Sequence, residues 1–168
     1  MDILEQMKRT GVPPQMINDA LLEKVASPFE SKFIALTNMV KEKPEFKVFL
    51  VHGEDSPQKD QFCAAFMKWY MLQFNKTGRW YGVCTQFEDT FGDAGVSVIP
   101  ATYLLNPVAA RIVSGAIREK LPLGRAFVLC SNDRDTFDGT FGKDFITFVS
   151  HQSLSIEVSV PRASIMVI

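Results

Sequence analysis

The 168-residue sequence carries little net charge and few of the residues that build metal or nucleophile sites. Its formal net charge of −1 gives no overall electrostatic attraction to nucleic acid or to an anionic membrane. The two histidines, His52 and His151, stand at no spacing from cysteine or carboxylate residues that would bind zinc or activate a nucleophile. The sequence therefore predicts no metal site and no nucleophilic catalytic group.

Cysteine is scarce, and long apolar runs are absent. The three cysteines, Cys63, Cys84 and Cys130, are widely spaced within apolar stretches, which favours buried free thiols in a reducing compartment over disulfides. The first residues, Met1–Gln6, lack the basic and apolar regions of a signal peptide. No apolar run approaches the roughly 20 residues that a membrane span needs. We therefore expect a cytoplasmic protein without membrane contact.

The composition that remains is that of a globular domain. Hydrophobic residues make up 46% of the chain and charged residues 22%, as in ordinary soluble proteins. The fourteen phenylalanines predict a core built on aromatic contacts. The length suits one compact unit.

Apolar segments of two kinds alternate along the chain. Helices are expected over residues 2–9, 15–25 and 59–74, from Ser27 to Lys41, from Pro107 onward with Val108, Ile112, Val113 and Ile117 facing inward, and up to Ser150. Strands are expected at Phe46–Val51, Arg79–Phe87, Val96–Ile99, Ala126–Cys130 and Ser153–Val160. Strands separated by helices predict an α/β fold with a largely parallel sheet.

One connection does not suit a parallel sheet. Only the residues Glu88–Ala94 join two of the expected strands, whereas a parallel crossover takes about a dozen or more residues. Either these two strands pair as a hairpin, or a crossover helix has been trimmed away.

The strand Phe46–Val51 leads into a sequence that resembles a phosphate-binding loop. Gly53 and Lys59 have the spacing of the motif G-x-x-x-x-G-K-[ST], and an apolar helix follows. However, Gln58 replaces the second glycine, and Asp60 replaces the hydroxyl that would bind Mg²⁺. Pro57 also removes one backbone N–H that the loop would direct at phosphate.

Other positions around this loop bear on the same chemistry. The carboxylates Glu54, Asp55 and Asp60 would repel a polyanion, and Lys59 offsets only one of them. The strand Val96–Ile99 ends in Pro100-Ala101, without the acidic pair that would hold Mg²⁺ and polarise water. Asn132, after the strand Ala126–Cys130, either orients a water molecule near a γ-phosphate or caps the next turn. His52, next to the loop, suits a hydrogen-bonded strand end better than a catalytic base.

These segments, in this order, resemble the ATPase domain of the bacterial replicative helicase loaders and related transposition ATPases, the DnaC and IstB type of AAA+ protein. The resemblance covers about residues 8–162. It rests on segments that the two share: Lys8–Pro14 with Ala20–Glu23, Val48–Gly53 with Lys59, Ile112–Arg118, Gly124–Asn132, Thr140–Phe145 and Ser159–Arg162.

The resemblance implies a P-loop NTPase-like three-layer αβα sandwich with a mostly parallel five-stranded sheet and short N-terminal helices. It divides the chain into a helical lead-in over residues 1–44 and a degenerate AAA+-like domain over residues 45–168. It places four residues at the nucleotide site: Gly53, Lys59, the sensor residue Asn132 and the second-sensor residue Arg162. Where the family's arginine finger is expected, this chain has Thr147-Phe148.

All departures from the family pattern fall on catalytic parts. We therefore expect no ATP hydrolysis, no catalytic residue and no bound cofactor, with ATP binding disfavoured. The expected function is that of an adaptor, inhibitor or structural subunit that contacts a replicative helicase or AAA+ loader subunits in DNA replication, with homo-oligomers allowed. One alternative is an ATP-binding loader with an atypical loop. Another is a single-stranded DNA-binding module that uses the aromatic residues Trp69, Trp80 and Tyr81 with Lys76 and Arg79.

Overall fold

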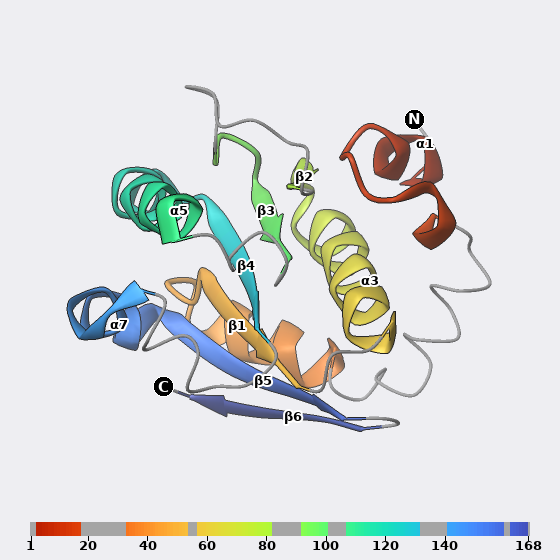
Figure 1. The fold of residues 1–168 in the computed structure, drawn as a ribbon. Coiled ribbons are helices and arrows are strands. Elements are labelled where there is room, and N and C mark those ends of the chain that lie inside the picture. Colours follow the sequence, from red (N-terminus) through yellow and green to blue (C-terminus); the bar gives the residue numbers. More distant parts are fainter. Residues whose placement is uncertain are drawn as a thin grey trace.

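The protein is built on one twisted six-stranded sheet with helices on both faces (Figure 1). The computed structural model describes residues 3–17, 33–53, 57–81, 92–100, 107–131, 141–159 and 162–167. In chain order the strands are β1 (Val48–His52), β2 (Gly78–Trp80), β3 (Val96–Ile99), β4 (Ala126–Ser131), β5 (Ser153–Ser159) and β6 (Arg162–Val167). Their order across the sheet is β2-β3-β4-β1-β5-β6.

The first five strands are parallel to one another, and β6 pairs antiparallel with β5 at one edge. The predicted α/β fold with a mostly parallel five-stranded sheet is thus confirmed. The strand β6 was not predicted, since the last strand expected from the sequence ends at Val160.

β2 and β3 pair in parallel, with Arg79 opposite Ser97. A hairpin between them is therefore excluded, and most of the connection that would hold a crossover lies outside the described part of the chain. The expected strand Arg79–Phe87 was too long, since β2 ends at Trp80 and residues 82–91 lie outside the described part of the chain. The connection is longer than the sequence suggested for that reason.

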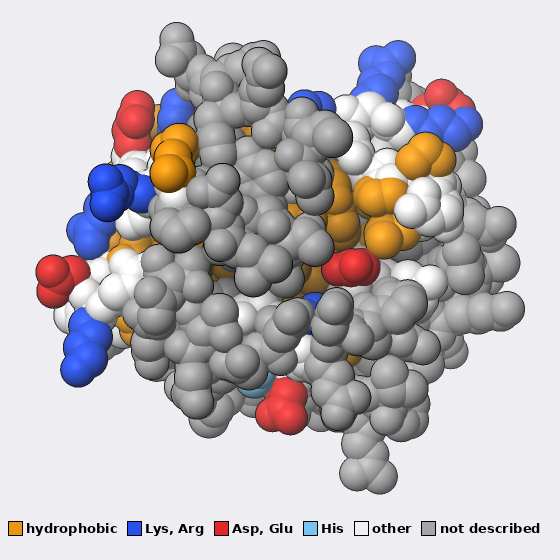
Figure 2. Space-filling model, viewed as in Figure 1, with side chains coloured by type: hydrophobic (Ala, Val, Ile, Leu, Met, Phe, Trp, Pro, Cys, Tyr) orange, Lys and Arg blue, Asp and Glu red, His pale blue; other side chains and the backbone are white. Residues whose placement is uncertain are grey.

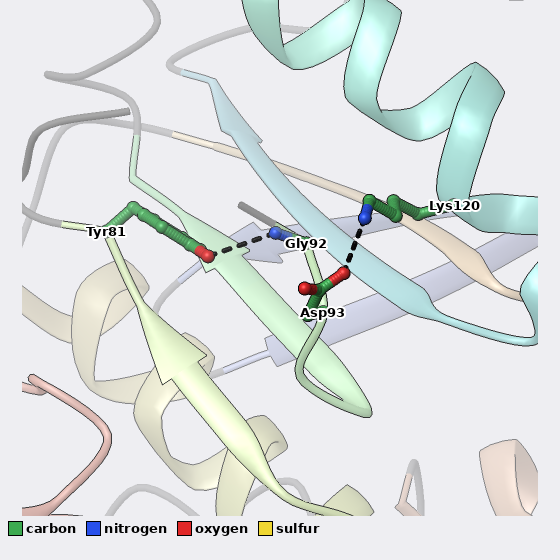
Figure 3. A network of polar contacts seen from close by, with 4 residues as sticks. All are labelled: Tyr81, Gly92, Asp93 and Lys120. Atoms are coloured by element: carbon green, nitrogen blue, oxygen red, sulfur yellow. Dashed lines mark hydrogen bonds and ion pairs between the residues drawn. The ribbon is translucent and has the colours of Figure 1, made fainter. Parts of the chain in front are cut away.

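Polar contacts fix the chain as it enters β3 (Figure 3). The backbone N–H of Gly92 donates to the hydroxyl of Tyr81, just after β2, at 3.1 Å. The ammonium of Lys120 forms an ion pair with the carboxylate of Asp93. The segment before β3 is thereby tied both to the end of β2 and to the helix that ends at Lys120.

The helices are α1 (Ile3–Lys8), the helical residues 33–42, α3 (Pro57–Phe74), α5 (Pro107–Lys120) and α7 (Lys143–Val149), with short 3-10 turns at Pro14–Met16, Leu121–Leu123 and Ser150–Gln152. The expected helices at 2–9, 59–74, after Pro107 and up to Ser150 are confirmed. The expected helix at 15–25 and the start of the one from Ser27 fall largely in residues 18–32, outside the described residues.

Alternate residues of β1 enter two separate cores. Phe49 and Val51 pack with residues of α1, the helical residues 33–42 and α3. Val48 and Leu50 pack with residues of α5 and α7. In Figure 1, α1 and α3 accordingly lie on one side of the sheet and α5 and α7 on the other. This is the predicted three-layer αβα sandwich, with β1 covered on both faces.

The larger core is aromatic, as the phenylalanine content predicts. Rings of Phe49 and Phe66 lie 4.8 Å apart between centroids, and rings of Tyr70 and Phe74 lie 4.7 Å apart. Met7 and Val12 belong to the same core as the sheet residues. The N-terminal segment therefore shares its hydrophobic core with the sheet that follows it.

The prediction for α5 was wrong in its phase. Val113 and Ile117 are buried as expected, but Val108 is 66% exposed and Ile112 is 40% exposed. The buried stripe contains Ala110 in their place, one helical turn before Val113. Apolar residue type alone had suggested a broader inward face.

No helix in the described part of the chain is both long enough and apolar enough to cross a membrane.

Candidate phosphate-loop site

The strand, loop and helix that the sequence predicts are present at the centre of the sheet. β1 ends at His52, Gly53 follows, and α3 begins at Pro57. β1 lies between β4 and β5, so Gly53 leaves the sheet where the carboxyl ends of three parallel strands meet. In open α/β folds this edge is where ligands bind.

Gly53 is required by its contact with a neighbouring strand. Its φ is +151°, and a Cβ atom built on it would lie 2.1 Å from the backbone oxygen of Val158 in β5. Any side chain at this position would therefore collide with backbone rather than with a movable side chain. The glycine has a structural reason that does not involve phosphate.

Lys59 lies in the first turn of α3 and is 1% exposed. Its ammonium donates to the carbonyl of Ser131, the last residue of β4, at 3.1 Å. It also donates to the carbonyl of Gly53 at 3.3 Å. The lysine therefore joins the ends of β1 and β4 to the start of α3.

His52 is 8% exposed and takes part in the hydrogen bonding of the sheet. Its Nε2 lies 2.9 Å from the hydroxyl oxygen of Ser155 in β5. This contact agrees with the interpretation of His52 as a hydrogen-bonded strand-end residue.

For the other predicted site residues, the structure describes little or nothing of the side chains. Asn132 lies outside the described residues, as do Glu54 and Asp55. Arg162 is the first residue of β6, where it pairs with Ser159 of β5, and only its backbone is described. Asp60 is half-buried in the first turn of α3. The structure therefore brings together Gly53 and Lys59 and leaves the roles of Asn132 and Arg162 as predictions.

Ser131, at the polar strand end Ser131-Asn132, contributes to this site through its backbone carbonyl, a role that the sequence did not predict. Its carbonyl faces Lys59 because β4 pairs in register with β1, with Ser131 opposite His52. The signal in the sequence was the polar end of the apolar strand Ala126–Cys130, which was considered only for Asn132.

Two expectations about other chemistry can be compared with the geometry. Among the described residues, no group of three or more His, Cys, Asp or Glu side chains could hold a metal ion. Trp80 and Tyr81 are 4% and 5% exposed, and the Nε1 of Trp69 donates to the Thr37 hydroxyl at 3.0 Å. Trp80 and Tyr81 are therefore buried and offer no platform on which bases could stack, whereas Trp69 is half-buried.

The chemical capacity of the site follows from these contacts. A phosphate-binding loop directs an ammonium and backbone N–H groups at the phosphates. Here the ammonium of Lys59 is directed at two backbone carbonyls instead. The arrangement stabilises the junction of β1, β4 and α3.

Two solved structures share this fold. A crystal structure of the DnaC helicase loader superposes with a TM-score of 0.59 at 12% sequence identity, over 77% of this chain and 89% of that one. The structure of a protein from Streptococcus pyogenes serotype M3, described as a primosome component, superposes with a TM-score of 0.62 at 10% identity. That match covers 92% of this chain and 94% of the other.

The similarity lies in structure and not in sequence. No protein-family model matches the sequence, and comparison with characterised proteins finds no significant sequence relative. The resemblance inferred from the sequence is thus confirmed at the level of the fold, which this chain shares with the structures of the DnaC helicase loader and the Streptococcus pyogenes protein.

Proposed function

We propose that this chain, which has the fold of a DnaC-like AAA+ domain, is a helicase-loader-like protein that has lost ATP hydrolysis and acts in DNA replication through protein contacts. It would serve as an adaptor, an inhibitor or a structural subunit of a helicase or loader assembly. The observation that carries the proposal is the burial of Lys59 with its ammonium on the carbonyls of Gly53 and Ser131.

The energetics of Lys59 support a structural role. Hydrogen bonds that involve a charged group contribute about 1.5–3 kcal/mol each. A nucleotide that recruited this ammonium would have to break its hydrogen bonds with both carbonyls, at a lysine that is 1% exposed. A phosphate would therefore compete with two backbone carbonyls for the Lys59 ammonium.

The residue types around Lys59 add to this interpretation. Gln58 and Asp60 stand where a phosphate loop has glycine and a Mg²⁺-binding hydroxyl. Pro100-Ala101 follows β3, where a catalytic strand would end in an acidic pair. Lost metal binding and lost water activation would remove hydrolysis even if a nucleotide entered.

The outer surface of α5 offers a means of contacting a partner. Val108 and Ile112 are exposed apolar side chains one turn apart, and the exposed Arg111 and Arg118 lie on the same helix. The guanidinium of Arg118 lies 4.7 Å from the ring centroid of Phe148 on α7, which is 37% exposed. In Figure 2, Lys and Arg side chains with some Asp and Glu lie along the edge that α5 and α7 occupy in Figure 1.

The partner class is taken from the proteins that share the fold. One of them is a helicase loader, and the other is described as a primosome component. We therefore propose a replicative helicase, or an AAA+ loader subunit bound to it, as the partner of this chain.

The test is co-purification of the full chain with the replicative helicase and the loader of its host, with and without ATP. We expect a complex that forms equally well in both conditions. A complex that forms only with ATP would instead support an ATP-binding loader with an atypical loop. Absence of a complex with either protein would contradict the proposed assembly.

A matched pair of variants shows whether the α5 surface is involved. Ile112→Glu places a charge on the exposed apolar surface, and Leu72→Glu does the same at an exposed leucine on α3, on the other side of the sheet. Ile112→Glu should weaken the complex at least tenfold, while Leu72→Glu should leave it unchanged. Equal effects of both variants would exclude α5 as the contact surface.

A further inference from the structure

Two cysteines that lie far apart in the sequence meet in the larger core. Cys63 is on α3 and Cys130 is on β4, and their Sγ atoms are 3.1 Å apart. Both are free thiols, with exposed fractions of 0% and 1%. A disulfide bond is about 2.05 Å long, so the two sulfur atoms need to approach each other by only about 1 Å to form one.

The position of the pair links it to the contact made by Lys59. Cys63 follows Lys59 by one helical turn on α3. Cys130 directly precedes Ser131, whose carbonyl accepts the hydrogen bond from Lys59. A bond between the two sulfur atoms would therefore connect covalently the same helix and strand that Lys59 connects by hydrogen bonding.

The two thiols react slowly as long as α3 stays packed against β4. The hydrogen bond with Cys130, followed by burial, raises the pKa of the Cys63 thiol well above its usual range. Only the thiolate attacks a disulfide, so exchange in the closed fold is slow. Reaction is expected during folding or when α3 opens locally from β4, because both thiols then reach solvent.

We propose that Cys63 and Cys130 are a redox pair that closes to a disulfide between α3 and β4 on exposure to a small disulfide such as oxidised glutathione. The thiolate of one cysteine attacks the small disulfide, forms a mixed disulfide and releases one small thiol. The thiolate of the other cysteine then attacks the protein sulfur of the mixed disulfide and releases the second small thiol. Two protein thiols are oxidised, one small disulfide is reduced, and the two protons leave on the small thiols.

The oxidised form has a defined structural consequence. The crosslink holds the first turns of α3 on the end of β4 and closes a long loop, since the two residues are 67 positions apart. A disulfide that forms between these two residues without distorting the fold should raise the midpoint of thermal unfolding by about 5–10 °C. This inference depends on the packing of α3 against β4 and holds whether or not the chain binds nucleotide.

The test is refolding of the reduced full chain in a mixture of reduced and oxidised glutathione, followed by alkylation with iodoacetamide in denaturant. We expect intact protein with one alkylated cysteine, Cys84, and a crosslinked peptide pair that contains Cys63 and Cys130. Three alkylated cysteines, or a disulfide that includes Cys84, would overturn the proposal.

Three alanine variants provide the matched controls. Cys84→Ala should keep the crosslink, whereas Cys63→Ala and Cys130→Ala should both lose it. A second experiment needs no variant and no refolding. Folded parent protein is incubated with oxidised glutathione in mild denaturant, and its free cysteines are then counted by the same alkylation. Absence of the Cys63–Cys130 crosslink there as well, or an oxidised form that melts no higher than the reduced one, would also overturn the proposal.

Discussion

At the scale of single residues, the candidate site is governed by backbone contacts. Gly53 and Lys59 have the spacing of a phosphate loop, and the structure places them together. Each has a contact that explains it without a nucleotide: Gly53 lies against the backbone of Val158, and Lys59 donates to Ser131. The fold alone therefore accounts for the glycine and the lysine at these two motif positions.

Replacement of Gly53 should be far more harmful than replacement of an ordinary glycine. Gly53→Ala places a Cβ atom 2.1 Å from the Val158 backbone oxygen, so β1 and β5 must separate. We expect a loss of about 2–4 kcal/mol in the free energy of unfolding, measured by urea denaturation. Gly115→Ala is the control, because nothing lies within 4 Å of a Cβ atom there and alanine favours the α5 helix by about 0.5–1 kcal/mol. Similar effects of the two substitutions would contradict the close contact.

Removal of the Lys59 charge should destabilise the fold in the absence of any ligand. Lys59→Met keeps an unbranched apolar chain but leaves the carbonyls of Gly53 and Ser131 without this donor. We expect a loss of about 1–3 kcal/mol in urea denaturation. The exposed Lys41→Met should change the free energy of unfolding by about 0.5 kcal/mol or less. An equally small effect at Lys59 would show that its ammonium does not support the fold.

The residues of the site differ in how far sequence could predict them. The juxtaposition of Gly53 and Lys59 follows from local spacing between a strand and a helix, which sequence contains directly. The acceptor at Ser131 and the collision partner Val158 come from β4 and β5, which reach β1 only through long-range pairing. Local patterns carry no register between distant strands, so these partners could not be predicted.

At the scale of elements, the sequence located most helices and strands but not every orientation. Period and flanking residues predicted α3 and the strands from β1 to β5. On α5, the apolar type of Val108 and Ile112 suggested burial, yet both are exposed while Ala110 is buried. The small residue lies in the stripe because it occupies the same helix face as Val113 and Ile117.

The corrected phase of α5 is open to a direct measurement with two identical substitutions. Ile117 is fully buried, and Ile112 is 40% exposed on the same helix. Ile117→Ala should cost about 2–5 kcal/mol in the free energy of unfolding, because it removes core contacts and leaves a cavity. Ile112→Ala should cost about 1 kcal/mol or less, since its side chain already meets solvent. A larger loss for Ile112→Ala than for Ile117→Ala would instead support the prediction that Ile112 faces the core.

At the scale of the whole molecule, the chain shares the fold of the DnaC helicase loader structure, while its sequence lacks residues that a phosphate-binding loop and a Mg²⁺ site use. Fold class could be predicted because the alternation of strands and helices and the order of the family-like segments extend over most of the chain. The edge strand β6 could not, because it follows Pro161 and depends on pairing with β5. The central claim is that this protein acts without hydrolysing ATP.

ATP turnover by the purified full chain tests that claim most directly. The measurement is phosphate release with and without Mg²⁺, beside a protein-free sample and the Lys59→Met variant after its folding is confirmed. Because the ammonium of Lys59 is held by Gly53 and Ser131, we expect release at the protein-free background in every sample. Tight ATP binding with Mg²⁺-dependent turnover that Lys59→Met abolishes would contradict the account.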